Sequence, residues 1–355
     1  MSADVFSHPW LGALFGDAEI AALLSAEATL SHMLATEAAY ARALGAVGLV
    51  PSDLAEAAAQ QITQFVPDGA DLARGMAQDG VVVPALIAQL RAALPEPLQG
   101  ALHRGMTSQD VMDTSLMLSL VPVLELMGQR ITTLQATLAD LDRQHGRNTM
   151  TGRTRMQLAL PITVGDRLAT WTAPLAPLAQ RLSDLADTLP RLQLGGPVGN
   201  RDSFQGKADD IATHMAANLG LKAPDAAWHS TRSALADWGH WLATLSGHLG
   251  KIGQDITLMA QQGIDEVQLS AGGGSSAMPH KQNPVQAETL VTLGRYNAVQ
   301  ISGLHHALLH EQERSGAAWA LEWMILPGMM MASGRALTLA QDLCTSIQHI
   351  GARAP

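Results

Sequence analysis

The segment 272–284 carries more reactive side chains in a short space than any other part of this chain. It reads Gly-Gly-Gly-Ser-Ser-Ala-Met-Pro-His-Lys-Gln-Asn-Pro. Three glycines allow the backbone to visit positive φ and to approach a ligand closely. The hydroxyls of Ser275 and Ser276 follow directly, and the ammonium group of Lys281 comes soon after. A mobile hydroxyl beside a cation is suited to proton transfer next to a bound anion.

The end of the same segment predicts the start of a helix. Asn283 suits the N-cap position and Pro284 the first helical position. The free N–H groups of that helix would point back at the loop and favour an anion there. The segment lacks the Gly-Lys-Ser/Thr ending of a phosphate-binding loop, and Ala277 replaces the last glycine of a Gly-x-Ser-x-Gly elbow. Met278 and its neighbours also argue against a plain glycine linker.

A second polar cluster opens a predicted helix at residues 103–110. Thr107 and Asp110 have the spacing of a capping box, which needs no further function. A cap alone does not require His103 or Gln109, and hydroxyls such as that of Ser108 at a helix start also bind carboxylates. Both interpretations stay open for this cluster.

A third cluster lies at residues 152–161. Arg153 and Arg155 flank Thr154, and Gln157 follows just before an apolar stretch. Two guanidinium groups here would clamp carboxylates through paired hydrogen bonds. Arginines near a loop are more often simply solvated, so this cluster by itself is weak evidence.

The elements that must position these clusters are long helices. One uninterrupted heptad seam is formed by Leu235, Trp238, Leu242, Leu245, Leu249, Ile252, Ile256 and Met259. Residues 110–143 predict a second long helix with a possible kink at Pro122, and residues 284–313 predict a third. Strand signals are confined to fragments such as 81–83 and 161–164. We therefore predict an all-α chain built around a helical bundle, with the polar clusters at its breaks.

Composition excludes several other classes. The formal net charge of −10 is unsuited to a general nucleic-acid binder, and only 15% of residues are charged, which suggests that helices cover one another in an oligomer. No apolar run approaches the ~20 residues of a membrane span. Cys344 is the only cysteine and the first residues make a poor signal peptide, so we expect a cytoplasmic protein. His306 and His310 lie one helical turn apart without a third ligand, so no metal is expected.

Taken together and in this order, the three clusters resemble the three signature regions of the aspartase/fumarase superfamily. The match of segment 274–284 to the superfamily's flexible signature loop is specific at nearly every position. With the elements His310 to Arg314 and Trp319 to Trp323, the pattern is most similar to the bacterial cycloisomerases that act on 3-carboxy-cis,cis-muconate. The resemblance extends from the first helices to about residue 340.

This resemblance implies a homotetramer whose active sites are each assembled from the three regions of three subunits. It implies that Ser275 exchanges the proton α to a substrate carboxylate, while Lys281 and Asn283 hold that carboxylate as negative charge develops and His103 assists. It assigns substrate contacts to Thr107, Ser108, Gln109, Arg153, Thr154, Arg155, Gln157, Ser276, Met278 and Arg314. The implied substrate is a small tricarboxylate, and no cofactor, metal, nucleic acid or membrane is involved.

One position departs from the superfamily pattern. Members that expel hydroxide or an amine usually carry histidine directly after the threonine of the second region, where this chain has Arg155. Such leaving groups need a proton, whereas a carboxylate needs none, so Arg155 favours lactone formation by an internal carboxylate. Two alternatives remain: a lyase of the superfamily that releases fumarate, as adenylosuccinate lyase does, and a non-catalytic helical assembly. The implied domains are 1–105, a central bundle 106–345 and a tail 346–355, with the C-terminal domain short or absent.

Overall fold

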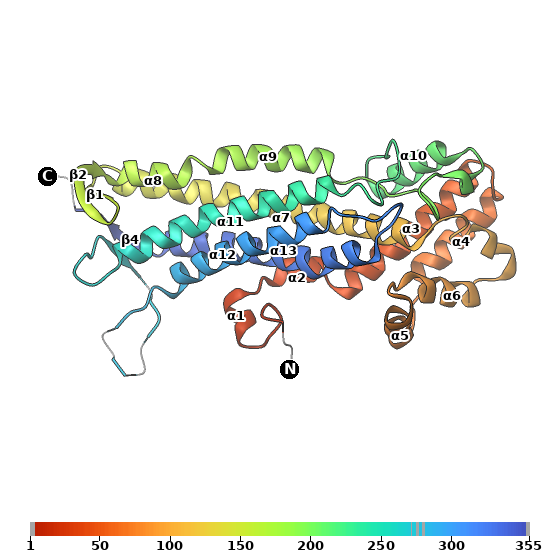
Figure 1. Cartoon of the computed structure of the whole chain (residues 1–355), viewed down its shortest axis with the longest axis horizontal. Helices are drawn as coiled ribbons and strands as arrows, with labels where there is room; N and C mark the ends of the chain where they lie inside the picture. Colours follow the sequence, from red (N-terminus) through yellow and green to blue (C-terminus); the bar gives the residue numbers. More distant parts are fainter. Residues whose placement is uncertain (1–3, 271, 275–276, 279–280, 353–355) are drawn as a thin grey trace.

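The computed structural model describes residues 4–270, 272–274, 277–278 and 281–352, which form a long helical bundle with a smaller group of helices at one end (Figure 1). The bundle consists of α7 (Ser108–His145), α8 (Val164–Thr172), α9 (Leu175–Thr188), α11 (Ser233–Met259), α12 (Val285–His306) and α13 (Gly316–Thr345), with α1 (Leu11–Phe15) and α2 (Ala18–Leu23) beside it. The predicted all-α class is confirmed. The helix expected over residues 110–143 is α7, and it continues through Pro122.

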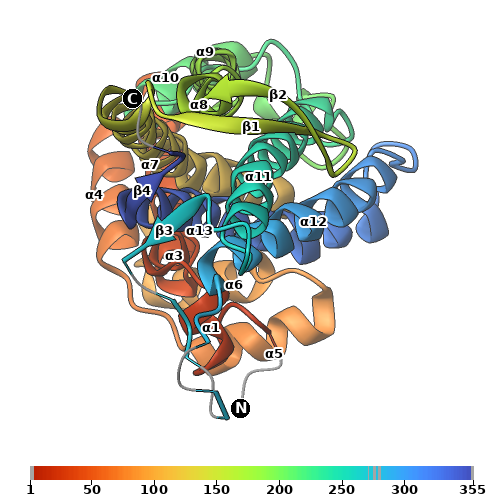
Figure 2. The ribbon, with the colours of Figure 1, turned by 90° about the vertical axis from the view of Figure 1, so that its left-hand side faces the viewer.

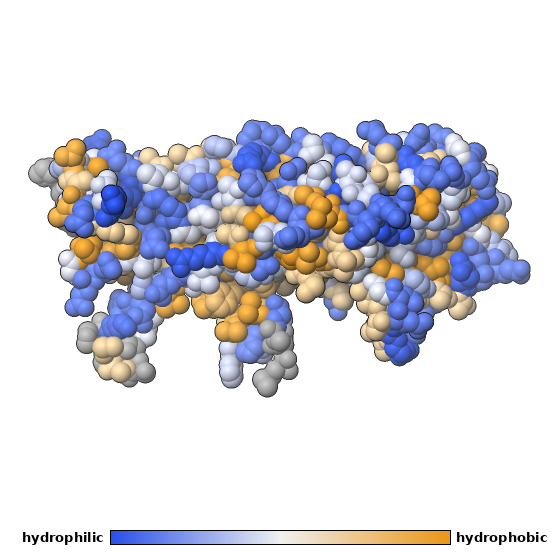
Figure 3. Space-filling view, viewed as in Figure 1, coloured by the Kyte–Doolittle hydropathy of each residue, from blue (hydrophilic) through white to orange (hydrophobic). Residues whose placement is uncertain are grey.

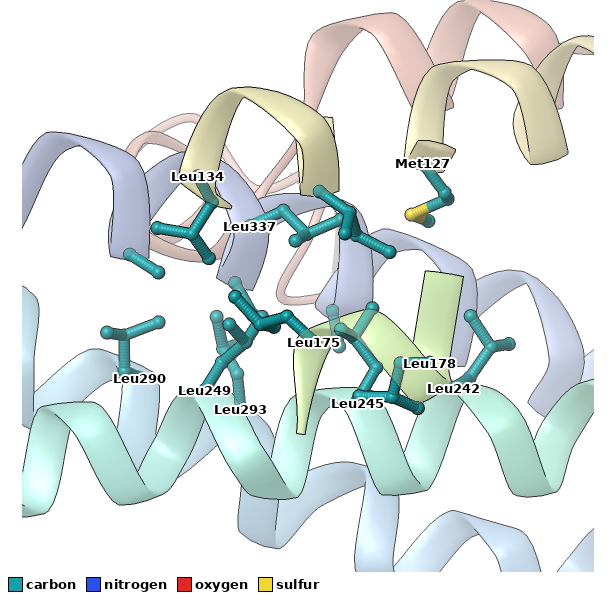
Figure 4. Packing of buried hydrophobic residues seen from close by; sticks show 14 of the residues in the cluster. Met127, Leu134, Leu175, Leu178, Leu242, Leu245, Leu249, Leu290, Leu293 and Leu337 are labelled. Carbon is teal, nitrogen blue, oxygen red and sulfur yellow. The ribbon is translucent and has the colours of Figure 1, made fainter. Parts of the chain in front are cut away.

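The predicted heptad seam forms the inner face of α11. All eight of its residues are at most 2% exposed. Figure 4 shows leucines of this seam pointing at side chains of α7, α9, α12 and α13, so that several helices share one apolar core. The seam therefore holds the bundle together from its centre.

Glycines let α11 and α12 approach very closely. A Cβ on Gly253 would lie 2.4 Å from the carbonyl oxygen of Ala287, and a Cβ on Gly294 would lie 2.8 Å from that of Ser246. The backbones of the two helices touch at these positions, and a residue larger than glycine would not fit there.

A second apolar core lies at one end of the bundle. It is formed by α3 (Ala26–Ala46), α4 (Ser52–Gln64), α5 (Gly69–Asp79), α6 (Val83–Ala93), the 3₁₀ helix η1 (Glu96–Ala101) and α10 (Ala208–Leu219). The connection after α9 brings α10, preceded by η2 (Asp202–Phe204), back to this end. The domain boundary at residue 105 remains a prediction. The two apolar cores do not separate at this residue: α10, which lies after it, packs with the early helices, and Ile20 of α2, which lies before it, packs with the bundle.

Short strands close the other end of the bundle, which faces the viewer in Figure 2. The strands β1 (Thr149–Thr154) and β2 (Gln157–Thr163) form an antiparallel hairpin, and β3 (Val267–Leu269) pairs with β4 (Ile347–Ile350). The fragment 161–163 is thus a strand as expected. The fragment 81–83 is not, because Val83 already belongs to α6, whose second residue is a proline.

The expectation that no apolar run approaches the length of a membrane span is wrong for α7. An 18-residue window of α7 has a mean hydropathy of 1.4, which by length and composition is apolar enough to cross a membrane. The helix is this apolar because other helices pack around it, and 56% of the window is buried inside the protein.

We predict that the contact between α11 and α12 is sensitive to a single methyl group. Gly253→Ala should lower the free energy of unfolding by roughly 1–3 kcal/mol, since its Cβ meets backbone that cannot move aside. Urea unfolding followed by circular dichroism measures the effect.

The matched control is Gly128→Ala in α7, where a Cβ would meet only the Leu182 side chain at an ordinary 3.7 Å. It should stabilise the helix by about 0.5–1 kcal/mol. Equal effects of the two substitutions would contradict the packing described here.

Candidate active site

The first polar cluster surrounds the N-terminus of α7, where Asp110 is fully buried. Its Oδ2 accepts hydrogen bonds from the backbone N–H groups of Thr107 (3.0 Å) and Gly196 (3.0 Å). Its Oδ1 accepts from the Gly195 N–H (2.8 Å) and lies 2.8 Å from Nε2 of His229. The expected cap is present, but the same carboxylate also ties the loop at 195–196 and His229 to the helix start. Asp110 thereby positions Thr107 and the residues that follow it.

His103 has a buried partner that the sequence did not reveal. Its Nδ1 lies 2.6 Å from Oε1 of Glu37, a residue of α3 that is fully buried. A carboxylate at this nitrogen orients the imidazole ring and leaves Nε2 for a ligand. The His103 side chain is 16% exposed, so the cluster stays accessible from outside. A lone acid on the alanine-rich, buried face of α3 was the available signal for Glu37.

Gln109 connects this cluster to a distant part of the chain. Its Nε2 donates to the carbonyl oxygen of His229 (2.9 Å), and its Oε1 accepts from Nε of Arg314 (2.9 Å). The helix expected over 284–313 ends at His306, and the connector 307–315 folds over to deliver Arg314. The structure thus brings together His103, Thr107, Ser108, Gln109 and Arg314, all predicted from the sequence, at one end of the bundle.

A buried ionic network anchors that connector. The guanidinium of Arg232 donates to Asp113 (2.6 Å) and to Glu322 (2.6 Å), and all three side chains are at most 3% exposed. Burial alone would lower the pKa of Arg232, but the two carboxylates outweigh it and raise the pKa. Burial raises the pKa of Glu322, with Arg232 opposing the shift. His310 of the connector lies 4.0 Å from Glu322, and burial, together with Arg232, lowers its pKa.

The second cluster forms the turn of the β1–β2 hairpin. Thr154 pairs with Gln157, and the two residues between them, Arg155 and Met156, have φ values of 50° and 66°. This is the backbone of a tight hairpin turn, which places exposed side chains at its tip. Arg153 is less exposed than the residues at the tip, and its Nη1 donates to Oε1 of Glu266 (2.6 Å).

The third cluster joins the bundle through a backbone pair. The N–H and C=O groups of Gly273 and Asn283 bond to each other in both directions at 2.8 Å. The prediction that Asn283 caps the helix is wrong by one residue: Pro284 holds the N-cap position, while the Asn283 amide turns back toward the Gly274 carbonyl at 3.5 Å. The exposed Lys281 donates its backbone N–H to the carbonyl of Met278, which is also exposed. The predicted residues Ser275 and Ser276 lie outside the described residues.

The three clusters do not meet within one chain. The first lies at the start of α7 and the second just beyond its end, so the length of a 38-residue helix, about 57 Å, separates them. The loop of the third cluster leaves the bundle at the same end as the hairpin (Figure 1). If the three clusters build one site, several copies of the chain must supply them.

Nothing in the described part of the chain suggests a bound metal ion. No three of its His, Cys, Asp or Glu side chains are grouped so as to hold one. His306 and His310 differ in setting, since His306 ends α12 and is exposed while His310 is buried in the connector.

The comparisons identify the class to which this fold and these clusters belong. Residues 18–303 match the family described as Lyase, and the chain belongs to this family of the aspartase/fumarase superfamily. A 3-carboxy-cis,cis-muconate cycloisomerase from Pseudomonas aeruginosa is 35% identical over 98% of this chain and 77% of its own length. A nitrosuccinate lyase from Streptomyces davaonensis is 34% identical over 92% of this chain and 72% of its own.

Solved structures agree with this placement. The 3-carboxy-cis,cis-muconate lactonizing enzyme from Pseudomonas putida has a TM-score of 0.88 and 34% identity, covering 96% of this chain and 77% of that one. Members of the superfamily act on small carboxylate substrates and are oligomeric. The resemblance seen in the sequence is confirmed.

We predict that Asp110→Asn destabilises the protein. Whichever of the two carboxylate oxygens is replaced by an NH2 group, two donors lose their acceptor. The free energy of unfolding should fall by about 1–3 kcal/mol. Urea unfolding gives the value.

Asp79→Asn is the matched control, because Asp79 is exposed at the end of α5 and its replacement should change stability by less than about 0.5 kcal/mol. A stable Asp110→Asn protein would show that this carboxylate does not organise the cluster.

Proposed function

We propose that this protein is a cycloisomerase that converts 3-carboxy-cis,cis-muconate to 4-carboxymuconolactone. Similarity to the P. aeruginosa cycloisomerase over nearly the whole chain, and to the P. putida lactonizing enzyme in both sequence and structure, supports this assignment. We further propose a cytoplasmic location, as composition suggests.

The observation that carries the proposal over other lyase chemistry is the residue at the hairpin turn. Arg155 is exposed at the tip and forms no ion pair with any residue that the structure describes. A guanidinium is always protonated and is therefore a poor general acid, but it is a good carboxylate ligand. A reaction in which an internal carboxylate is the nucleophile or leaving group needs no proton donor at this position.

The proposed reaction is an addition followed by protonation. One carboxylate oxygen of the substrate attacks the double bond conjugated with another carboxylate, and a carbon–oxygen bond forms to close a five-membered lactone. The π electrons of that double bond move into the acceptor carboxylate and make an enediolate. Lys281, Asn283 and the N–H groups of the loop stabilise this charge. Ser275 then gives its proton to the α carbon and recovers one from solvent; in the reverse direction it is the base.

The first and second clusters orient the substrate in this scheme. Ser108 and Thr107, at the free N–H groups of α7, suit one carboxylate. His103, held by Glu37, and Arg314, held by Gln109, stand beside them in fixed orientations. Thr154 and Gln157 hold the substrate from the hairpin of another copy. Orientation of an internal nucleophile supplies much of the acceleration in such a reaction.

We propose a homotetramer because the clusters need several copies to meet. Exposed apolar side chains on α12, on the connector and on α13 support the same assembly: Val299 is 68% exposed, Leu309 74% and Met324 80%. Figure 3 shows hydrophobic residues gathered along the middle of the bundle on the face it displays. Such patches mark protein–protein contacts more often than free surface.

A second candidate is elimination from a substituted succinate. The similarity to the nitrosuccinate lyase of S. davaonensis is almost as high as that to the cycloisomerase, so it favours this alternative specifically. Assays with argininosuccinate, adenylosuccinate, malate and nitrosuccinate, followed by the appearance of fumarate, separate elimination from cyclisation. A non-catalytic assembly would show neither turnover nor tricarboxylate binding.

The direct test is to incubate the purified protein with 3-carboxy-cis,cis-muconate and follow the diene absorbance. We expect the absorbance to fall as the lactone forms. Unchanged absorbance with a folded, oligomeric protein would refute the proposed activity.

We predict that Ser275→Ala lowers kcat at least about 100-fold, because proton transfer to carbon loses its donor. Circular dichroism and sedimentation should show an unchanged fold and assembly. Ser270→Ala, which removes an exposed hydroxyl five residues earlier, should keep normal turnover. Near-normal kcat in Ser275→Ala would remove this serine from its role.

A further inference from the structure

A cationic pocket lies beside the β1–β2 hairpin, and its lining extends beyond the signature clusters. It is a cavity of about 400 Å³ between the hairpin, α8 and the last turns of α11. Its charged lining comprises Arg153, Arg155, Arg167, Lys251, Asp255 and Glu266. Four cations and two carboxylates give it a formal surplus of two positive charges, in a chain whose net charge is −10.

The two carboxylates are already engaged. Oε1 of Glu266 accepts the hydrogen bond from Arg153 at 2.6 Å. Oδ2 of Asp255 accepts from Nε1 of Trp171 at 2.7 Å and also pairs with the ammonium of Lys251. These groups therefore balance Arg153 and Lys251 and leave no carboxylate for the other two cations.

Arg155 and Arg167 are the surplus charges. Within the described part of the chain, neither forms an ion pair, and the only polar contact of the Arg167 guanidinium is a weak one, 3.4 Å to the thioether sulfur of Met259. Arg167 belongs to α8 and is only partly exposed, so a rigid helix presents it to the cavity rather than to bulk water. A guanidinium in such a place favours a planar anion bound through two hydrogen bonds.

We propose that this pocket binds one carboxylate of the substrate, and that Arg167 is a specificity-determining residue which selects trianionic over dianionic acids. Assigning that carboxylate to the substrate rests on the proposed function. In the proposed reaction each part of the site binds one carboxylate of the substrate. The loop at 272–284 binds the carboxylate that becomes the enediolate, and the start of α7 binds a second. The pocket takes the third, which a dicarboxylate lacks.

Isothermal titration with two matched acids tests the proposal on the intact protein. Tricarballylate and glutarate share a three-carbon chain and differ by the central carboxylate. At fixed pH and ionic strength, the unmodified protein should bind tricarballylate more tightly than glutarate. Arg167→Gln should weaken tricarballylate roughly 10- to 100-fold, the usual loss for a charged hydrogen bond, and change glutarate less than about twofold.

Two further variants complete the design. Arg167→Lys keeps the charge and should restore part of the lost affinity. Arg91→Gln removes an exposed arginine from α6, at the opposite end of the molecule, and should leave both affinities unchanged. Equal binding of the two acids by the unmodified protein, no binding of tricarballylate, or parallel losses for both acids in Arg167→Gln would overturn the proposal.

The proposed cycloisomerase activity and the proposed carboxylate pocket can be refuted independently of each other. The diene assay decides whether the protein is a cycloisomerase, whereas the ratio of the two affinities decides whether the pocket discriminates by charge. A protein that turns over the diene but shows no change in this ratio in Arg167→Gln refutes the pocket alone.

Discussion

The length of α7 is the constraint on which the candidate site depends. A continuous helix holds the capped cluster at its start and the arginine hairpin at its end about 57 Å apart, and no loop movement closes such a gap. The heptad seam of α11 and its glycine contacts with α12 keep the bundle rigid along this length. If the three clusters build one site, each chain presents parts of several sites, and a complete site requires assembly.

Buried hydrogen bonds and ion pairs fix the geometry of the first cluster and of the connector that carries Arg314. Asp110 satisfies donors from the helix start, the loop at 195–196 and His229 at once, so these three elements move together. The network of Arg232, Asp113 and Glu322 fastens the connector that carries Arg314. Because such buried ion pairs often contribute little net stability, we infer that this network serves to define one arrangement of the chain.

Much of this arrangement was predictable from the sequence because it follows local rules. The seam of α11, the long α7 and the cap at Thr107 each arise from residue spacing within one element. The partners of the reactive residues were not predictable in this way. Glu37 meets His103 from 66 residues away, and Arg232 joins Asp113 and Glu322 from separate helices. The cap at Asn283 failed because its backbone pairs with Gly273, a tertiary contact that local propensity does not include.

The most direct test of this account is to mix two inactive variants, one changed at His103 and one at Ser275, and let their subunits exchange. If each site takes its first and third clusters from different chains, an equal mixture regains turnover in about a quarter of its sites, because each cluster is intact in half of them. Mixed tetramers that are confirmed by mass spectrometry and yet stay as inactive as either parent would contradict it.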